Sequence, residues 1–339
     1  MVHDAGVLAA WAGRSQIMRR IVDVSSPIDM QQLRGRLGDA SVVQFSQPLA
    51  EAEYRSLAAL LAEHPTVTLR AYGFDEDLAT LRFLRWFPRL RRFSVAHLHN
   101  LTELAPLHQL SADVELLDIG ETRKPLNLTP VAAFRDLRQL RIVAHRGGLP
   151  ELLDANPNLQ GLSLWRLPVD QYLPLIALPH LQSLALTLGS LAHGEWLLQV
   201  PTLRYVALRA VRKLTDLHPV TRLPALQWLC LDALTADRLP DFSSCTTLLR
   251  ADCTAMRHLR HTTSLQGLAA APQLRELSVT ESLLPADAFK PFVDHPTLEH
   301  VSVGLGTERR SCEAEQLLRR TPPRADTDFA VRYGLLRML

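Results

Sequence analysis

Lysine is scarce in this 339-residue chain, and long apolar runs are absent. The lysines are Lys124, Lys213 and Lys290, so arginine carries nearly all the positive charge. With 37 basic and 35 acidic residues the net charge is +2, too small to draw nucleic acid or a membrane surface to the molecule as a whole. No apolar run reaches the roughly 18 residues of a membrane span. We therefore expect neither membrane association nor a general affinity for nucleic acid.

Cysteine is also scarce, which excludes several classes of site. The four cysteines form no CxxC pair and no secreted disulfide framework; they are Cys230, Cys245, Cys253 and Cys312. Residues 1–16 lack the basic region of a signal peptide. These absences predict a cytoplasmic protein with no structural metal and no cofactor.

Catalytic motifs are absent as well: the chain has no GxSxG, GxxxxGK[ST], HExxH or strand-linked GxGxxG. The pairs His97/His99 and His258/His261 have spacings that suit a metal, but no acidic or cysteine ligand stands beside them. Solvated or structural histidines are the favoured interpretation. Cys230 as a nucleophile would need a histidine, and the expected strand order puts His300 three strands away, roughly 14 Å. We assign no catalytic residue.

Leucine is what the chain has in excess: 66 of 339 residues, at a mean hydropathy of only +0.01. That much leucine without a membrane span requires a regular way of burying it. A unit Pro-x-Leu-x-x-Leu-x-Leu recurs every 22 to 26 residues. Seven units begin at Pro88, Pro157, Pro179, Pro201, Pro224, Pro272 and Pro296, and three that lack the proline begin their apolar frame at Val114, Leu137 and Leu248.

This pattern resembles the leucine-rich-repeat superfamily over residues 65–320, as about 11 units of 22–26 residues. The resemblance implies an α/β fold: a right-handed solenoid, or horseshoe, with a parallel concave sheet and short helices on the convex face. Alternation at the end of each unit independently predicts a strand. Short apolar stretches at 149–155, 172–178, 194–200 and 286–293 predict the helices. The superfamily's asparagine ladder residue is missing, so a divergent, bacterial type of solenoid is expected and its turn geometry stays open.

The flanks are expected to cap the solenoid. Residues 1–64 form the predicted N-terminal cap, with a helix over 1–16; strands are expected at 20–24, 41–45 and 66–71, and a helix at 52–62. A final helix is expected at 311–320. Residues 321–339 form the predicted C-terminal cap, in which segment 328–339 folds back over the last repeat. A partner-binding tail is the alternative for that segment.

One arginine-rich stretch offers a nucleic-acid candidate: Arg82, Arg85, Arg89, Arg91 and Arg92 surround Trp86. Basic residues interleaved with an aromatic can follow phosphates and stack on bases. The same spacing describes the solvated side of one helix whose Leu81, Leu84 and Phe87 face inward, and we favour that interpretation.

The outward positions of the strands carry the functional information. They form three columns, of which the middle one is small at Ser163, Ala185, Ala207 and Cys230 and so predicts a trough. Aromatic and charged residues surround it. We predict that a partner binds Arg141, Trp165, Tyr205, Arg209, Trp228, Asp232, Arg250, Asp252 and Glu276. Arg250 is expected over the Trp228 ring, and Arg209 is expected to pair with Asp232. The alternative is that these rings only shield the sheet.

These observations favour a non-enzymatic scaffold that binds a protein or peptide on its concave face. The resemblance implies interaction proteins, among them secreted effectors and toxin-neutralising immunity proteins. The alternative function is an enzyme or biosynthetic accessory protein that uses the trough as a small-molecule or peptide pocket. Fold alone does not decide between the two.

Overall fold

The computed structural model describes residues 21–38, 40–171 and 177–322, which belong to two compact units. The described part of the first unit is 21–38 and 40–137, and that of the second is 138–171 and 177–322. The predicted helix over 1–16, most of the stretch 172–178 and segment 328–339 lie outside the described residues. Of the predicted cap over 321–339 only residues 321 and 322 are described.

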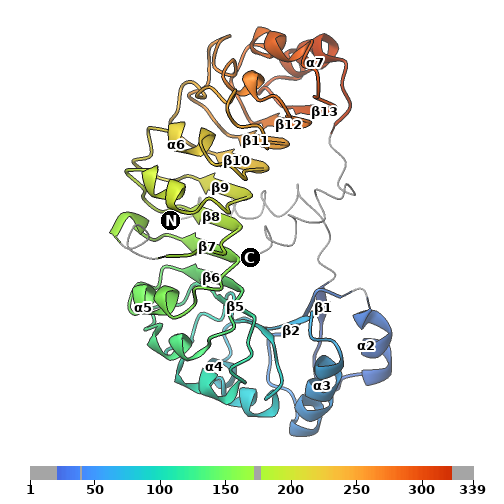
Figure 1. Cartoon of the computed structure of the whole chain (residues 1–339). Coiled ribbons are helices and arrows are strands. Elements are labelled where there is room, and N and C mark those ends of the chain that lie inside the picture. Colours follow the sequence, from blue (N-terminus) through green and yellow to red (C-terminus); the bar gives the residue numbers. More distant parts are fainter. Residues whose placement is uncertain (1–20, 39, 172–176, 323–339) are drawn as a thin grey trace. The chain divides into compact units, whose positions relative to one another are not determined.

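In the first unit, strands pair in parallel in the order of the sequence, from β1 to β5 (Figure 1). Its elements are β1 (Ile21–Asp23), α2 (Met30–Leu37), β2 (Val42–Phe45), α3 (Glu51–Glu63), β3 (Thr68–Ala71), α4 (Glu76–Ala79), η1 (Arg82–Trp86), β4 (Arg92–Ser94), η2 (Ala105–Gln109), β5 (Leu116–Ile119) and η3 (Thr129–Ala133). The strands predicted at 20–24, 41–45 and 66–71 are confirmed as β1, β2 and β3, and the helix predicted at 52–62 is α3.

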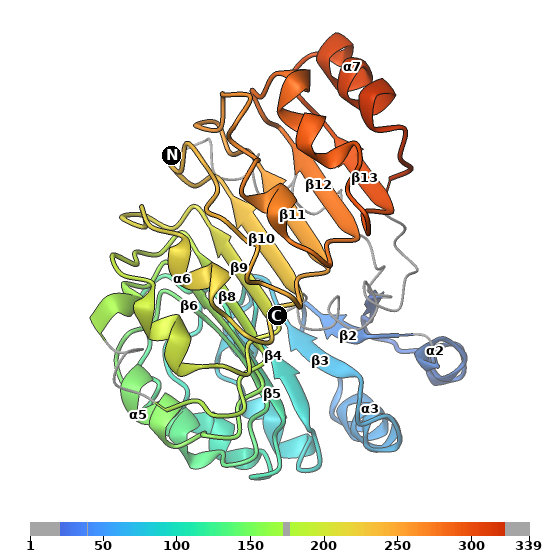
Figure 2. The same ribbon diagram turned by 45° about the horizontal axis from the view of Figure 1, so that its top comes forward.

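The second unit continues the same plan from β6 to β13, and α7 packs beside β13 at its end (Figure 2). Its elements are β6 (Gln139–Val143), α5 (Leu149–Asp154), β7 (Gly161–Trp165), η4 (Val169–Gln171), β8 (Ser183–Thr187), η6 (Glu195–Gln199), β9 (Tyr205–Arg209), α6 (His218–Thr221), β10 (Trp228–Asp232), β11 (Arg250–Thr254), η7 (Leu268–Ala270), β12 (Glu276–Thr280), η8 (Ala286–Phe292), β13 (His300–Val303) and α7 (Glu308–Leu318). Helices predicted at 194–200 and 286–293 are 3₁₀ segments, which suit so short a connection.

The repeat leucines form the core, as the pattern predicts. Leu184 and Leu229 alternate along their strands with residues of the opposite face, and both are buried. The proline lies four residues before its strand, in a turn: at Pro201 the turn is closed by the Leu203 N–H, which donates to the Val200 carbonyl at 3.2 Å. Proline suits the second position of a turn because its φ is already set and no N–H is needed there.

The turn after each strand explains how the sheet does without an asparagine ladder. The residue that follows each of β6 to β12 has a positive φ, and none of these residues is glycine: they are Ala144, Arg166, Leu188, Ala210, Ala233, Ala255 and Glu281. From β6 to β11 this residue donates its N–H to the last carbonyl of the next strand, for example Ala233 to Thr254 at 3.0 Å. Backbone hydrogen bonds therefore form a ladder along this edge.

At the opposite end of the strands, threonine side chains bond to the preceding repeat in three places. The hydroxyls of Thr202, Thr247 and Thr297 each donate to a carbonyl of the preceding repeat, at 2.7, 2.8 and 2.9 Å respectively. These threonines satisfy carbonyl groups at the turn before the strand, where burial without a partner would be costly.

Candidate functional site

The parallel register of the second unit confirms the predicted columns. Tyr205 pairs with Trp228, and Trp228 pairs with Arg250. In the neighbouring columns Cys230 pairs with Asp252, and Asp232 pairs with Arg209. We call the surface that these columns form on β6 to β12 the column face.

Trp228 lies at the centre of the column face and contacts a neighbour on each adjacent strand. Its ring meets Tyr205 edge to face, with centroids 5.2 Å apart. The Arg250 guanidinium lies over the same ring at 4.5 Å, as predicted. Edge-to-face and cation–π contacts each add about 0.5–1.5 kcal/mol beyond area burial. The three side chains therefore hold one another in place across β9, β10 and β11.

Two carboxylates complete this cluster. The Trp228 Nε1–H donates to Asp252 Oδ2 at 2.6 Å, and Arg250 Nε donates to Asp252 Oδ1 at 3.1 Å. Arg250 Nη1 also donates to Glu276 Oε2 at 2.9 Å. Burial raises the pKa of Glu276 above its ordinary value, and Arg250 opposes that rise without reversing it. Asp252 thus accepts from both Trp228 and Arg250, and Arg250 links three strands.

Arg209 forms a second cluster on β9 and β10. Its Nη2 donates to Tyr205 Oη at 3.0 Å and to Cys230 Sγ at 3.7 Å. Burial lowers the pKa of the Arg209 guanidinium, but Tyr205, Cys230 and Asp232 outweigh burial and raise the pKa above its ordinary value. Asp232, the predicted partner of Arg209, is one of the groups that raise this pKa.

Trp165 stands apart from these clusters, on β7. The Arg141 guanidinium lies over its ring at 4.6 Å, and its Nε1–H donates to Ser163 Oγ at 3.2 Å. Arg141 and Trp165 come from adjacent strands, β6 and β7. Trp165 is partly exposed, so its ring presents an apolar surface fixed by a charged neighbour.

The column face is less exposed than its outward register predicts. Tyr205 and Trp228 are 0% and 2% exposed, because their rings and polar atoms are turned onto neighbouring side chains. Arg209, Asp252 and Glu276 are also buried. Arg141, Trp165, Asp232 and Arg250 keep partial exposure. The nine predicted residues therefore include five that are buried and four that reach the surface.

The predicted trough residues are buried too. Ser163, Ala185, Ala207 and Cys230 are each no more than 6% exposed. Burial raises the pKa of Cys245 to about 11 and raises that of Cys253 still further, which makes both thiols poor nucleophiles at neutral pH. Strands β11 and β12 separate Cys230 from His300, as the strand order predicted.

Neither a metal-binding cluster nor a membrane-spanning helix is present among the described residues. No group of three or more His, Cys, Asp or Glu side chains within residues 21–38, 40–171 and 177–322 is placed to hold a metal ion. The rings of His97 and His99 are 5.9 Å apart, and His99 stacks on the exposed Phe74 ring at 4.8 Å. None of the described helices combines the length and the apolar character needed to cross a bilayer.

The arginine-rich stretch forms η1, the turn that follows it and the first residue of β4. Leu81, Leu84 and Phe87 are buried, which confirms the inward face predicted for this segment. Arg55 of α3 lies over Trp86 at 4.4 Å, and sequence reasoning missed this partner because it is 31 residues away. No local spacing pattern could have indicated it.

No protein-family model matches the sequence, and no curated protein matches it. Similar solved structures include internalin C2 from Listeria monocytogenes, with 17% identity over 65% of this chain and 82% of that chain and a TM-score of 0.42. A leucine-rich-repeat protein of Leptospira interrogans, LIC12759, has 13% identity over 85% and 90%, with a TM-score of 0.46. TLR13, solved in complex with ssRNA13, has 18% identity over 89% of this chain and 50% of that chain, with a TM-score of 0.49.

At such identities a likeness concerns the fold alone. The fold is established by the molecule's own features: parallel strands paired in sequence order, one strand per repeat, and a repeated left-handed turn after each strand from β6 to β12. The chain is a leucine-rich-repeat solenoid.

Proposed function

We propose that the chain is a non-enzymatic recognition scaffold that binds a protein or peptide through the column face of the second unit. The observation that carries the proposal is the position of Arg250, which contacts Trp228, Asp252 and Glu276 on three adjacent strands. Its side chain is only 13% exposed, so the guanidinium is held with little freedom. A side chain fixed in this way loses little entropy on binding.

The nine residues of the proposed site have two roles. Tyr205, Arg209, Trp228, Asp252 and Glu276 are buried and position their neighbours. Arg141, Trp165, Asp232 and Arg250 reach the surface and contact the partner. Tryptophan and arginine are the residue types that dominate binding hot spots, and a buried supporting layer is typical beneath them.

The exposed members indicate the chemistry of the partner. Trp165 offers an apolar ring, Arg141 offers positive charge, and Asp232 offers a carboxylate, whereas the charge of Arg250 is balanced by Asp252 and Glu276. The partner that suits this arrangement is a protein surface with an apolar anchor next to one acidic group and one basic group. The roles implied by the resemblance, effector and toxin-neutralising immunity protein, both fall within this class of function, and the identity of the partner would distinguish them.

The test compares three forms of the full-length protein as bait in extracts of its source organism: the wild type, Trp165→Ala and Phe74→Ala. Phe74 is 66% exposed and lies outside the column face, so its removal is a matched control for the loss of an aromatic side chain. A specific partner should be captured by the wild type and by the Phe74 variant, and lost with Trp165→Ala.

Titration calorimetry with the purified partner should then show a loss of roughly thirtyfold or more for Trp165→Ala, the effect of removing a hot-spot residue. Far-UV circular dichroism should be unchanged in both variants. A partner that binds Trp165→Ala as tightly as the wild type would refute the column face as the binding surface.

A further inference from the structure

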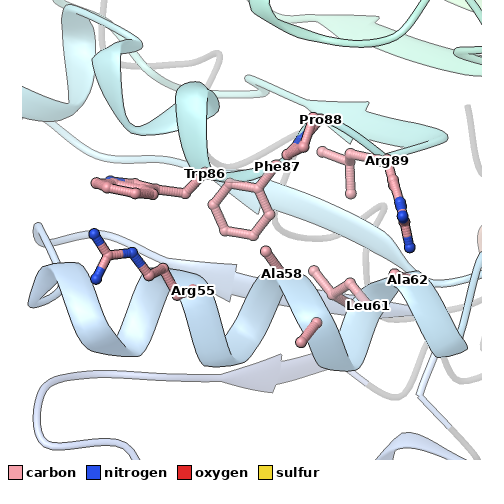
Figure 3. Close-up of a pocket in the computed structure, with 10 residues that line it drawn as sticks. Arg55, Ala58, Leu61, Ala62, Trp86, Phe87, Pro88 and Arg89 are labelled. Carbon is pink, nitrogen blue, oxygen red and sulfur yellow. The ribbon is translucent and has the colours of Figure 1, made fainter.

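A groove lies between helix α3 and the segment from η1 to Leu90, within the first unit (Figure 3). It encloses about 210 Å³. Ala58, Ala59 and Ala62 of α3 line one side, and Phe87 and Pro88 line the other. Ala59, Ala62 and Pro88 are exposed, so the groove presents apolar surface to solvent.

The wall of the groove is rigid because an aromatic cluster supports it from behind. Phe87 packs edge to face against Tyr54 and Phe83, with centroids 6.1 and 6.4 Å away. Tyr54 stacks in turn on Phe83, with ring centroids 5.8 Å apart. The Tyr54 side chain is itself held in place, because its hydroxyl accepts a hydrogen bond from the Leu49 N–H at 3.1 Å. The groove is therefore preformed.

Positive charge stands at both ends. Figure 3 shows Arg55 beneath Trp86 at one end and Arg89 directed toward Ala62 at the other. Arg85 also lies over the Trp86 ring, at 4.9 Å. Arg55 has an ion pair with Glu51, whereas within the described residues Arg85 and Arg89 form none. No carboxylate is among the residues that line the groove.

The size and the walls of the groove decide what fits. At about 210 Å³ it is smaller than the roughly 300–1,000 Å³ of pockets that enclose a whole small molecule, so it suits one apolar side chain of a larger ligand. An extended peptide would find no strand edge here to pair with its backbone, because α3 already satisfies its own backbone groups. A helix satisfies its own backbone, and the alanines of α3 allow it to approach closely.

The spacing of the charges sets the pattern of the ligand. Arg89 approaches α3 at Ala62, so Ala62 marks the position of the second charge along the helix. Arg55 and Ala62 are seven residues apart on α3, or roughly 10 Å along its axis at about 1.5 Å per residue. A helix lying along α3 would match this with acidic residues at positions i and i+7 and an apolar anchor between them. We propose that this groove, which we call the α3 groove, binds an acidic amphipathic helix of a partner protein.

The proposal is independent of the column face, since it concerns a different unit and other residues. The test uses the full-length protein and a fluorescein-labelled helical peptide of about four turns, with two glutamates roughly seven positions apart and a leucine between them. A control peptide has lysine in place of both glutamates. Binding is followed by fluorescence anisotropy at low and at raised salt.

The wild type should bind the glutamate peptide saturably, and raised salt should weaken that binding because exposed ion pairs are screened. Arg89→Glu should weaken it roughly fivefold or more, and it should improve binding of the lysine peptide. Ala62→Leu should also weaken binding, because it fills the groove without a change of charge. Arg36→Glu on α2 makes the same change of charge on an exposed residue outside the groove, and should leave binding unchanged.

Trp165→Ala should bind the glutamate peptide as the wild type does, so that failure of one proposal can be told from failure of the other. The proposal is overturned if the wild type shows no saturable binding, if the two peptides bind equally, or if Arg89→Glu and Arg36→Glu behave alike. It is also overturned if a labelled single-stranded oligonucleotide binds in an Arg89-dependent way and the peptide does not, since the stretch would then be a nucleic-acid site.

Discussion

Replacing Ala233 by glycine should stabilise the protein, because Ala233 is held in a backbone conformation that disfavours a side chain. It follows β10 with a φ of 51°, and it is exposed, so its methyl group contributes little to the core. Its N–H donates to the Thr254 carbonyl at 3.0 Å. Glycine adopts the same φ without strain and keeps the hydrogen bond.

Two opposed effects set the size of the change in the free energy of unfolding. The left-handed conformation costs a non-glycine residue roughly 1–2 kcal/mol, and glycine removes that cost. Glycine also loses more backbone entropy on folding, which costs roughly 0.5–1 kcal/mol relative to alanine. The balance is a gain of about 0.5–1 kcal/mol in the free energy of unfolding.

The assay is urea unfolding followed by far-UV circular dichroism, in which the midpoint for Ala233→Gly should rise. Ala270→Gly is the matched control: Ala270 is an exposed alanine of the same unit but ends the 3₁₀ segment η7. Only the entropy cost applies there, so its midpoint should fall. If the urea midpoints of both variants fall by the same amount, the left-handed residues after the strands carry no strain and the reasoning is refuted.

Two further predictions concern the second unit. Gly267→Ala should cost about 1–3 kcal/mol, since the new Cβ would lie 2.2 Å from the Pro240 carbonyl oxygen. In Gly194→Ala the new Cβ would lie 3.4 Å from its nearest neighbour, the Pro219 side chain, so this variant should lose clearly less stability in the same urea assay. An equal loss of stability in the two variants would contradict the packing argument. Burial lowers the pKa of His295, whose Nε2 lies 3.0 Å from the Ala271 carbonyl oxygen. The unfolded chain therefore binds this proton more readily, and stability should fall as pH drops below about 6.5. Between about pH 7.5 and about pH 5.5 the thermal unfolding temperature should fall less for His295→Gln than for the wild type. If the unfolding temperatures of the two proteins change with pH in parallel, His295 does not cause the loss of stability.

The turn geometry shows where prediction from sequence stopped. The asparagine missing from the position three residues after the last strand leucine was visible in the sequence, and its absence left the turn geometry open. In the structure the residue directly before that position is left-handed, and from β6 to β11 its backbone N–H donates to the next strand. Because alanine, arginine, leucine and glutamate all occupy this left-handed position, no residue type could indicate a conformation imposed by the adjacent repeat.

In the candidate site, too, some features followed from the sequence and others depended on the tertiary structure. That Tyr205, Trp228 and Arg250 would be neighbours followed from the repeat, because the unit length fixes which residues pair across parallel strands. That Trp228 and Arg250 would share Asp252, and that the Tyr205 and Trp228 rings would be buried, depended on side-chain orientation.

The sequence by itself determined the repeat, the strand register and the membership of each column, because these follow from a period of 22 to 26 residues and from alternation along a strand. The tertiary structure alone decided which column residues reach the surface and which are buried supports. It also decided that Arg55 of α3 meets Trp86 and that the α3 groove exists. The physical reason is range: pairing between successive repeats is local and periodic, whereas contacts between a helix and a distant turn depend on how whole elements pack.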